Sequence, residues 1–323
     1  MNAQRVSLDL LWVSQTIASM SLAASPSAPA ARRPHGSDTF SYSAPFDYTP
    51  PSTKGVPLIF ASPHSGQYYP DTMREQLCVP LIDLQRTEDA FMDALIAPGR
   101  EEGAGVMTAR YARGFVDLNR DPLELDRRMF DGAPPRQCGL PGPRVEAGLG
   151  CIPRVGARGH AIYRGRLDPS EGEARLRDVH DAYHGRLSDE LKRLRAEHGV
   201  SFLIDCHSMP SRQPGRRPLA DIVLGDRFGS SCSAKLTARV EAKFRKMGYS
   251  VARNAPYAGG YTTLRYGRPR RGIHALQIEI RRDLYMDEMR VQRTDVFPRM
   301  AKHVGELISD LCAFAVRQAR SAS

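Results

Sequence analysis

The chain has 323 residues, of which 41% are hydrophobic and 25% are charged, as in an ordinary globular protein. This composition excludes fibrous, collagen-like and wholly disordered proteins. No stretch reaches the roughly 18 unbroken apolar residues that a membrane-spanning helix needs, because polar residues interrupt the N-terminal candidate at positions 8–20. We therefore expect no membrane association, and the same segment favours a disordered extension over a cleaved leader.

Basic residues exceed acidic residues by ten, and the isoelectric point is near 9.5. Such an excess attracts phosphate backbones, so a basic nucleic-acid-binding protein is one alternative. Six of the 46 basic residues are lysines, and the remaining 40 arginines are spread along the chain without a basic run. This distribution favours a small anionic substrate over nucleic acid, because a guanidinium group binds a carboxylate through two hydrogen bonds.

The six cysteines are isolated from one another and include no CxxC pair. The chain is also long enough to build a hydrophobic core without covalent cross-links. Neither a disulfide framework nor a cysteine zinc site is indicated, so we expect a reducing cytoplasm as the location.

Taken in chain order, residues 1–50 are rich in Ala, Ser and Pro and are expected to form a disordered extension before a folded domain at 51–323. Apolar runs in this domain predict strands at 56–62, 200–205, 221–225, 249–253 and 273–280, with one or two more between 105 and 121. Apolar residues at helical spacing predict helices at 84–96, 170–198, 231–247 and 287–317. The helix at 170–198 is expected to end at Gly199. Strands and helices alternate without a linker or repeat, which predicts a single α/β domain with a mixed, mostly parallel sheet flanked by helices.

Ionisable residues stand at or near the ends of the predicted strands: His64, His207 and Glu279. Buried ionisable groups are costly unless they are paired or bound to a metal. Two imidazoles and a carboxylate would give a metal site with an open position for water, and a further carboxylate could act as general base. Asp205, two residues before His207, could orient an imidazole. For each histidine alone, an ordinary packing role is the alternative.

A second group of polar residues lies in the sequence RGFVDLNR at 113–120. Asn119 and Arg120, expected at a strand end, could hold a carboxylate through amide and guanidinium donors. Arg113 could polarise a carbonyl or bind a second carboxylate. The alternatives are a solvated surface arginine, or a structural ion pair between Asp117 and Arg120.

Three further motifs favour structural roles. His180 and His184 have the spacing of the HExxH zinc motif, but Asp181 is too short for the glutamate role and the helical wheel favours core packing. The two glycines at 259–260 lack the strand and helix context of a nucleotide-binding loop. They indicate a turn or a close approach of the backbone to a ligand. Cys206 cannot pair with His207 as a nucleophile, because adjacent strand residues point to opposite faces.

Several motifs occur together in one order, and this combination resembles the N-formylglutamate amidohydrolase family over about residues 55–310. The motifs are SPHSG at 62–66, RTEDAFMD at 86–93, VDLNRDP at 116–122, LIDCHSMPS at 203–211, NAPYAGGYTT at 254–263 and LQIEIRRDLYMDE at 276–288. The resemblance implies a fold similar to the zinc peptidases and phosphorylase/hydrolase-like enzymes. It also implies that the domain at 51–323 hydrolyses N-formyl-L-glutamate to formate and L-glutamate, often the last step of histidine breakdown. A related zinc amidase acting on another N-acyl amino acid is the alternative.

The resemblance further implies a Zn²⁺ site, or one for another divalent transition metal such as Mn, Co or Fe. His64 and His207 match the metal histidines. Gln67 stands where an HxxE pattern would place the carboxylate ligand, so this role passes to Asp89, with Glu88 as the alternative.

The remaining roles that the resemblance implies concern catalysis and substrate binding. Glu279 matches the general base. Asn119 with Arg120 resembles the pair that binds a substrate carboxylate. Arg113 is assigned a catalytic role beside the reacting carbonyl, and Tyr261 a contact with the substrate.

Overall fold

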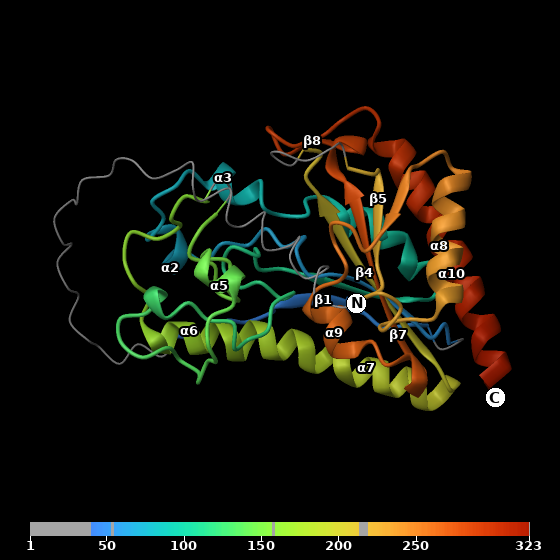
Figure 1. The fold of residues 1–323 in the computed structure, drawn as a ribbon, viewed down its shortest axis with the longest axis horizontal. Coiled ribbons are helices and arrows are strands. Elements are labelled where there is room, and N and C mark those ends of the chain that lie inside the picture. The colour runs from blue at the N-terminus through green and yellow to red at the C-terminus, as the bar shows by residue number, and fades with distance from the viewer. Residues whose placement is uncertain (1–39, 53–54, 157–158, 213–218, 323) are drawn as a thin grey trace, which may run out of the picture.

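The computed structural model describes residues 40–52, 55–156, 159–212 and 219–322. A seven-stranded sheet crosses the molecule with helices on both faces (Figure 1), in the strand order β1-β3-β2-β4-β7-β5-β6. Its strands are β1 (Phe46–Thr49), β2 (Leu58–Ser62), β3 (Gly105–Ala109), β4 (Ser201–Met209), β5 (Ile222–Gly225), β6 (Val251–Arg253) and β7 (Ile273–Arg281). Strands β3, β2, β4 and β7 run parallel in the centre, β1 is antiparallel at one edge, and β5 and β6 run antiparallel to β7. The predicted α/β domain with a mixed, mostly parallel sheet is confirmed.

The helices and short turns surround this sheet. They are α2 (Asp71–Arg74), α3 (Leu81–Gln85), α4 (Met92–Ile96), α5 (Pro143–Glu146), α6 (Pro169–Arg175), α7 (Ala182–His198), α8 (Ala234–Lys246), α9 (Tyr261–Tyr266) and α10 (Phe297–Ala322). Short 3-10 turns occupy Ala97–Arg100, Arg127–Met129, Pro269–Arg271 and Arg282–Leu284. A separate two-stranded ribbon of β8 (Met286–Asp287) and β9 (Gln292–Arg293) precedes α10.

The two faces of the sheet have different surroundings, and strand β4 shows how the sequence separates them. Phe202, Ile204 and Cys206 belong to the apolar core that also contains α4, α8 and α10. Leu203 belongs to the second core, with α7 and the long excursion between β3 and α6. Because side chains alternate along a strand, His207 points to the second side, away from the Cys206 thiol. A nucleophilic Cys–His pair is therefore excluded, as the sequence predicted.

The long helix predicted at 170–198 is confirmed as α6, a π-helical turn at Leu176–Asp181 and α7. Asp168 caps its first turn by accepting a hydrogen bond from the Ser170 N–H at 2.7 Å. Gly199 follows its last residue with a φ of 72°, a left-handed conformation that glycine adopts without steric cost.

The predicted helix at 84–96 is wrong. The segment instead forms α3 and α4, separated by an irregular turn in which Phe91 has a φ of 65°. In this turn the Asp89 N–H donates to the His64 carbonyl at 2.9 Å, so a contact remote in sequence replaces a helical hydrogen bond. Helical spacing alone does not reveal this break.

Other boundaries also differ from the predictions. Residues 1–39 of the expected extension lie outside the described residues, but Phe46–Thr49 forms β1, so the sheet begins before residue 51. One strand, β3, is found between 105 and 121, and the residues after Ala109 form a loop. The last helix begins at Phe297 rather than at 287, because the β8–β9 ribbon occupies the intervening residues.

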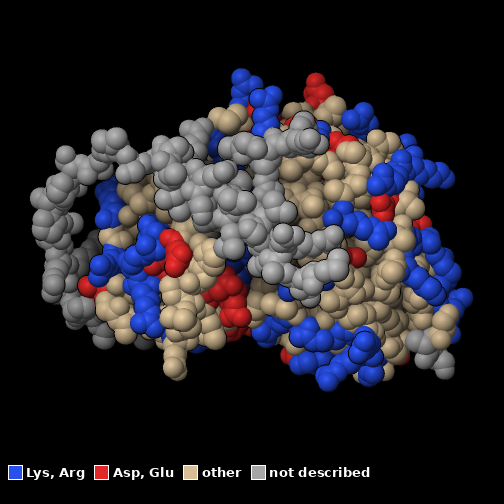
Figure 2. Space-filling model, in the orientation of Figure 1, with Lys and Arg blue, Asp and Glu red and all other residues tan. Residues whose placement is uncertain are grey.

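Three predictions from the composition concern membrane-spanning helices, surface charge and the cysteines. No helix of the described ranges is long and apolar enough to span a bilayer. Figure 2 shows the basic side chains of this face in several separate groups, with acidic and other residues between them. All six cysteines are free.

Candidate metal centre and active site

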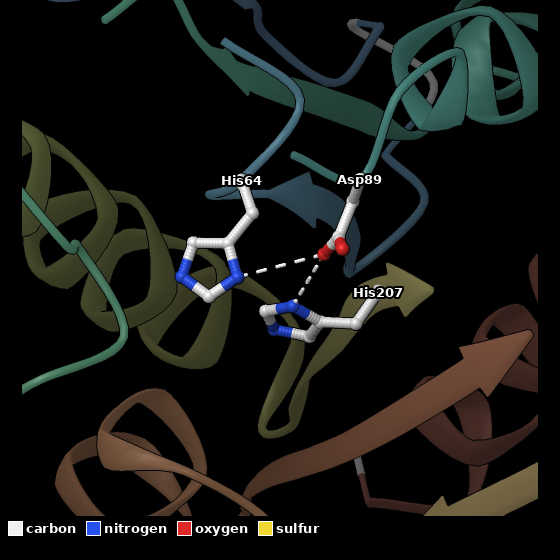
Figure 3. A group of neighbouring side chains, drawn as sticks. All are labelled: His64, Asp89 and His207. Carbon is white, nitrogen blue, oxygen red and sulfur yellow. Dashed lines mark hydrogen bonds and ion pairs between the residues drawn. The ribbon is translucent and has the colours of Figure 1, made fainter. Parts of the chain in front are cut away.

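Three buried side chains converge at the carboxyl end of the central strands: His64, Asp89 and His207. His64 follows β2 by two residues, Asp89 lies between α3 and α4, and His207 lies in β4. One carboxylate oxygen of Asp89 faces both imidazoles, at 3.0 Å from His207 Nδ1 and 3.5 Å from His64 Nδ1 (Figure 3). The potential ligand atoms all lie within 4.8 Å of one another. The two predicted histidines and the preferred carboxylate, Asp89, therefore lie in one cluster.

The chemistry of this cluster fits a divalent transition metal. His64 Nδ1 is buried and has no hydrogen-bond partner among the described residues. Burial raises the pKa of Asp89, but the His207 and His64 imidazoles outweigh this effect and hold the pKa well below its usual range. Asp89 is thus an ionised carboxylate beside two imidazole nitrogens, which is the donor set of catalytic zinc and related metals.

The structure separates the two candidates for the carboxylate ligand. Glu88 is buried away from the cluster and accepts a hydrogen bond from the Tyr69 hydroxyl. Burial raises the pKa of Glu88 to about 8. Gln67 is exposed. Asp89, and not the alternative Glu88, therefore belongs to the cluster.

Each imidazole has a second carboxylate on its far nitrogen. Asp117 Oδ1 lies 2.6 Å from His64 Nε2, and Asp205 Oδ2 lies 3.0 Å from His207 Nε2. Carboxylates in this position fix the ring orientation and increase the basicity of a metal-binding histidine. Asp205 matches its predicted place beside an imidazole. The contact of Asp117 with His64 was not predicted, because an ion pair with Arg120 was the only role expected for this aspartate.

The other oxygen of Asp89 is held by two donors. Asp89 Oδ1 accepts hydrogen bonds from Ser208 Oγ at 3.1 Å and from Arg282 Nη2 at 3.0 Å. These contacts leave Oδ2 to face the histidines. Arg282 was not predicted as a site residue, and its only signal in the sequence is its position directly after the strand that carries Glu279.

Glu279 lies beside His207 because their strands run in register. In the parallel pair of β4 and β7, His207 is opposite Glu279. Gln277 Nε2 donates to Glu279 Oε1 at 2.7 Å, and burial raises the pKa of Glu279 to about 7. A carboxyl group with this pKa can accept and return a proton near neutral pH.

Asn119 and Arg120 reach the same region from the loop after β3, rather than from the strand end that the sequence predicted. Asn119 Nδ2 lies 3.2 Å from His207 Nε2, and Asn119 Oδ1 accepts the Thr262 N–H at 2.9 Å. Arg120 forms no ion pair with any described residue, and its Nε atom is buried without a hydrogen-bond partner. The alternative ion pair with Asp117 is therefore wrong. The guanidinium donates one long hydrogen bond, from Nη1 to the Asn119 carbonyl at 3.5 Å, and has no carboxylate partner among the described residues, so it can bind an anion.

His180 and His184 anchor this loop and take no part in the metal cluster. Both are buried, with His180 Nε2 at 3.0 Å from the Arg120 carbonyl oxygen and His184 Nε2 at 2.8 Å from that of Leu118. Burial holds the pKa of His184 well below its usual range, so its imidazole is neutral. The predicted packing role is confirmed. The two contacts fix the backbone on either side of Asn119.

Arg113 and Tyr261 border this loop as well. Arg113 Nη2 pairs with Asp117 Oδ2 at 2.7 Å, so Arg113 contacts the carboxylate that supports His64. The Tyr261 hydroxyl accepts a hydrogen bond from Arg265 Nη1 at 2.6 Å, and its ring packs against His184 with 5.1 Å between centroids. Both residues thus lie next to groups that position the candidate site.

Comparison with known proteins identifies the family of this chain. The family model described as N-formylglutamate amidohydrolase matches residues 56–286. The chain belongs to the N-formylglutamate amidohydrolase family. This confirms the resemblance, and it places the protein among enzymes that hydrolyse amide bonds.

Individual members of this family match most of this chain. An N-formylglutamate deformylase of Pseudomonas aeruginosa is 33% identical over 269 residues, which cover 80% of this chain and 94% of the relative. An N-formylglutamate deformylase of Pseudomonas putida is 32% identical over 240 residues, with 72% and 83% covered. The crystal structure of N-formylglutamate amidohydrolase from Ralstonia eutropha JMP134 is 32% identical, with a TM-score of 0.80 over 85% of this chain and 99% of that chain.

Proposed function

We propose that this protein hydrolyses N-formyl-L-glutamate to formate and L-glutamate, with a divalent metal held by His64, Asp89 and His207. The observation that carries the proposal is the meeting of this triad with Glu279 at the carboxyl end of the central strands. The curated relatives named N-formylglutamate deformylase support the choice of substrate. Release of L-glutamate fits the last step of histidine breakdown, and the six free cysteines fit a reducing cytoplasm.

The mechanism assigns each proton and bond to a group of the chain. When bound, the metal supplies a Lewis acid that acidifies water and polarises the formyl carbonyl. Glu279 accepts a proton from the water that attacks the formyl carbon. The same carboxyl group then gives this proton to the glutamate nitrogen as the C–N bond breaks. The net change is addition of one water across the amide bond.

The other candidate residues bind and orient the substrate. The Asn119 amide and the unpaired Arg120 guanidinium hold one carboxylate, because both are donors beside the cluster. Arg113 acts on the reacting carbonyl from behind Asp117: it is ion-paired with that carboxylate, and its charge lies within electrostatic range of Asp89 and Glu279. Tyr261 forms part of the wall next to the anchored loop.

The test of this function is formate release from N-formyl-L-glutamate by the purified chain, before and after chelation. We expect chelation to abolish formate release and added Zn²⁺ to restore it. N-acetyl-L-glutamate serves as the comparison for a related deacylase. Hydrolysis of the acetyl compound without formate release from the formyl compound would contradict the proposed substrate, and activity that survives complete metal removal would contradict the metal.

The support of His64 by Asp117 gives a second prediction. Asp117→Asn is expected to weaken metal binding by about 10- to 100-fold, because the amide removes the negative charge beside His64 Nε2. Metal affinity is measured by competition with a coloured chelator. Asp131→Asn, at an exposed position, is the matched control. Equal metal affinity in the two variants would refute a supporting role for Asp117.

A further inference from the structure

The loop after β5 has an unusual backbone that is held in place by several hydrogen bonds. Arg227, Phe228 and Gly229 have φ angles of 51°, 56° and 80°, although non-glycine residues seldom adopt positive φ. Asp226 Oδ1 accepts hydrogen bonds from the Gly229 N–H and from Asn254 Nδ2, at 2.9 and 2.8 Å. Asn254 Oδ1 in turn accepts from the N–H groups of residues 226 and 228. Such strain persists where the surroundings fix the backbone, and it concentrates at functional sites.

This loop sets the Arg227 side chain against the glycine pair next to Asn119. The Arg227 N–H donates to the Ala258 carbonyl at 2.8 Å, and Arg227 Nη1 lies 3.4 Å from the Gly259 oxygen. A Cβ atom at Gly259 would lie 3.0 Å from Arg227 Cγ, and one at Gly260 would lie 2.4 Å from Asn119 Nδ2. The two glycines therefore allow Arg227 and Asn119 to approach the same short segment from two sides.

Arginines gather here without carboxylate partners. Arg120, Arg144, Arg227 and Arg268 form no ion pair with any residue in the described parts of the chain. Burial lowers the pKa of Arg120 and of Arg227, and the positive charge of Arg144 lowers both further. Glu124 lies within electrostatic range of Arg120 and Arg144 but forms no ion pair with either. The charge of Asp117 also reaches Arg120 and raises its pKa, but the two residues form no ion pair. A group of cations that are not paired directly with carboxylates attracts an anionic group.

We propose that Arg227, assisted by Arg144, binds the second carboxylate of a dicarboxylic N-acyl amino acid. The inference rests on the proposed function. Asn119 and Arg120 hold one carboxylate beside the metal cluster, and the glycine pair connects that position to Arg227. A substrate with an acidic side chain would thus reach both positions at once. Arg227 is then the residue that selects acidic over neutral side chains.

The test compares two substrates that differ in one charge. In the wild type, kcat/KM is expected to be about 10- to 100-fold higher for N-formyl-L-glutamate than for N-formyl-L-glutamine, because a charge-assisted hydrogen bond is lost with the amide. Arg227→Gln is expected to remove most of this preference, mainly through a higher KM for the glutamate substrate. Turnover of N-formyl-L-glutamine should change by less than about threefold, since that contact is already absent.

Arg317→Gln is the matched control, because it removes the same charge at an exposed position on α10, which packs against the opposite face of the sheet. Arg144→Gln, also at an exposed position, tests the assisting cation should the Arg227 variant fail to fold. An unchanged substrate preference in folded Arg227→Gln, or in Arg144→Gln if the former does not fold, overturns the subsite alone. If the wild type releases formate from neither substrate, the proposed function fails and the subsite falls with it.

Discussion

Glu279→Gln is expected to retain the bound metal and to lower kcat for formate release by about 10²- to 10⁴-fold. The reason is that the amide cannot take a proton from water or return one to the departing nitrogen. Glu279 lies opposite His207 in the sheet and is not a member of the triad, so the metal donors are unchanged. The measurement pairs kcat with the metal content of the same preparation.

The substitution is also conservative for the local structure. The side-chain oxygen of the amide can still accept the hydrogen bond that Gln277 Nε2 donates to Glu279. Glu75→Gln changes the same charge at an exposed position and is the control for net charge. If Glu279→Gln keeps kcat within about threefold of that control, Glu279 is not the general base. A loss of metal together with activity would instead place Glu279 among the ligands.

The strands that carry the site are predictable from the sequence because they are buried on both faces. Such strands form continuous apolar runs, and an ionisable residue at their ends stands out. This signal is sufficient for His64 and His207. Glu279 stands out for the same reason, as an acidic residue inside the apolar run of β7.

The parts that were missed depend on contacts between residues far apart in the sequence. The helix predicted at 84–96 is interrupted because Asp89 must turn toward His64 and His207, and its backbone N–H bonds to the His64 carbonyl. Asp117 and Arg282 support the cluster through partners that only the folded chain brings close. Periodicity describes one segment at a time, so it cannot reveal these contacts.

The position of Arg227 illustrates the same limit for substrate binding. In an arginine-rich chain a single arginine gives no signal, and the left-handed loop that fixes it has no glycine at residues 227 or 228. The adjacent glycines 259 and 260 indicated either a turn or a close approach of the backbone to a ligand, whereas in the structure side chains of the chain itself approach them. Which residue makes that approach follows only from the structure.

His207→Ala is expected to abolish metal binding and, with it, formate release. The change removes one of the three donors of the cluster, and the two that remain come from segments outside the sheet strands. We expect the affinity for Zn²⁺ to fall by more than about 100-fold, since removal of even an outer partner costs 10- to 100-fold. Metal content after gel filtration and formate release are the two measurements.

The effect of His207→Ala on folding must be separated from its effect on the metal. Burial lowers the pKa of His207, but Asp205 and Asp89 outweigh it and hold the pKa well above its usual range. Without metal, the charged imidazole therefore lies between two buried carboxylates. Its loss leaves Asp205 without an ion-pair partner among the described residues, whereas Asp89 keeps Arg282 and His64, and we expect a cost of several kcal/mol. Unfolding of the metal-free variant in urea measures this cost, with exposed His160→Ala as the control. A folded His207→Ala protein that binds Zn²⁺ as tightly as the control would exclude His207 as a ligand.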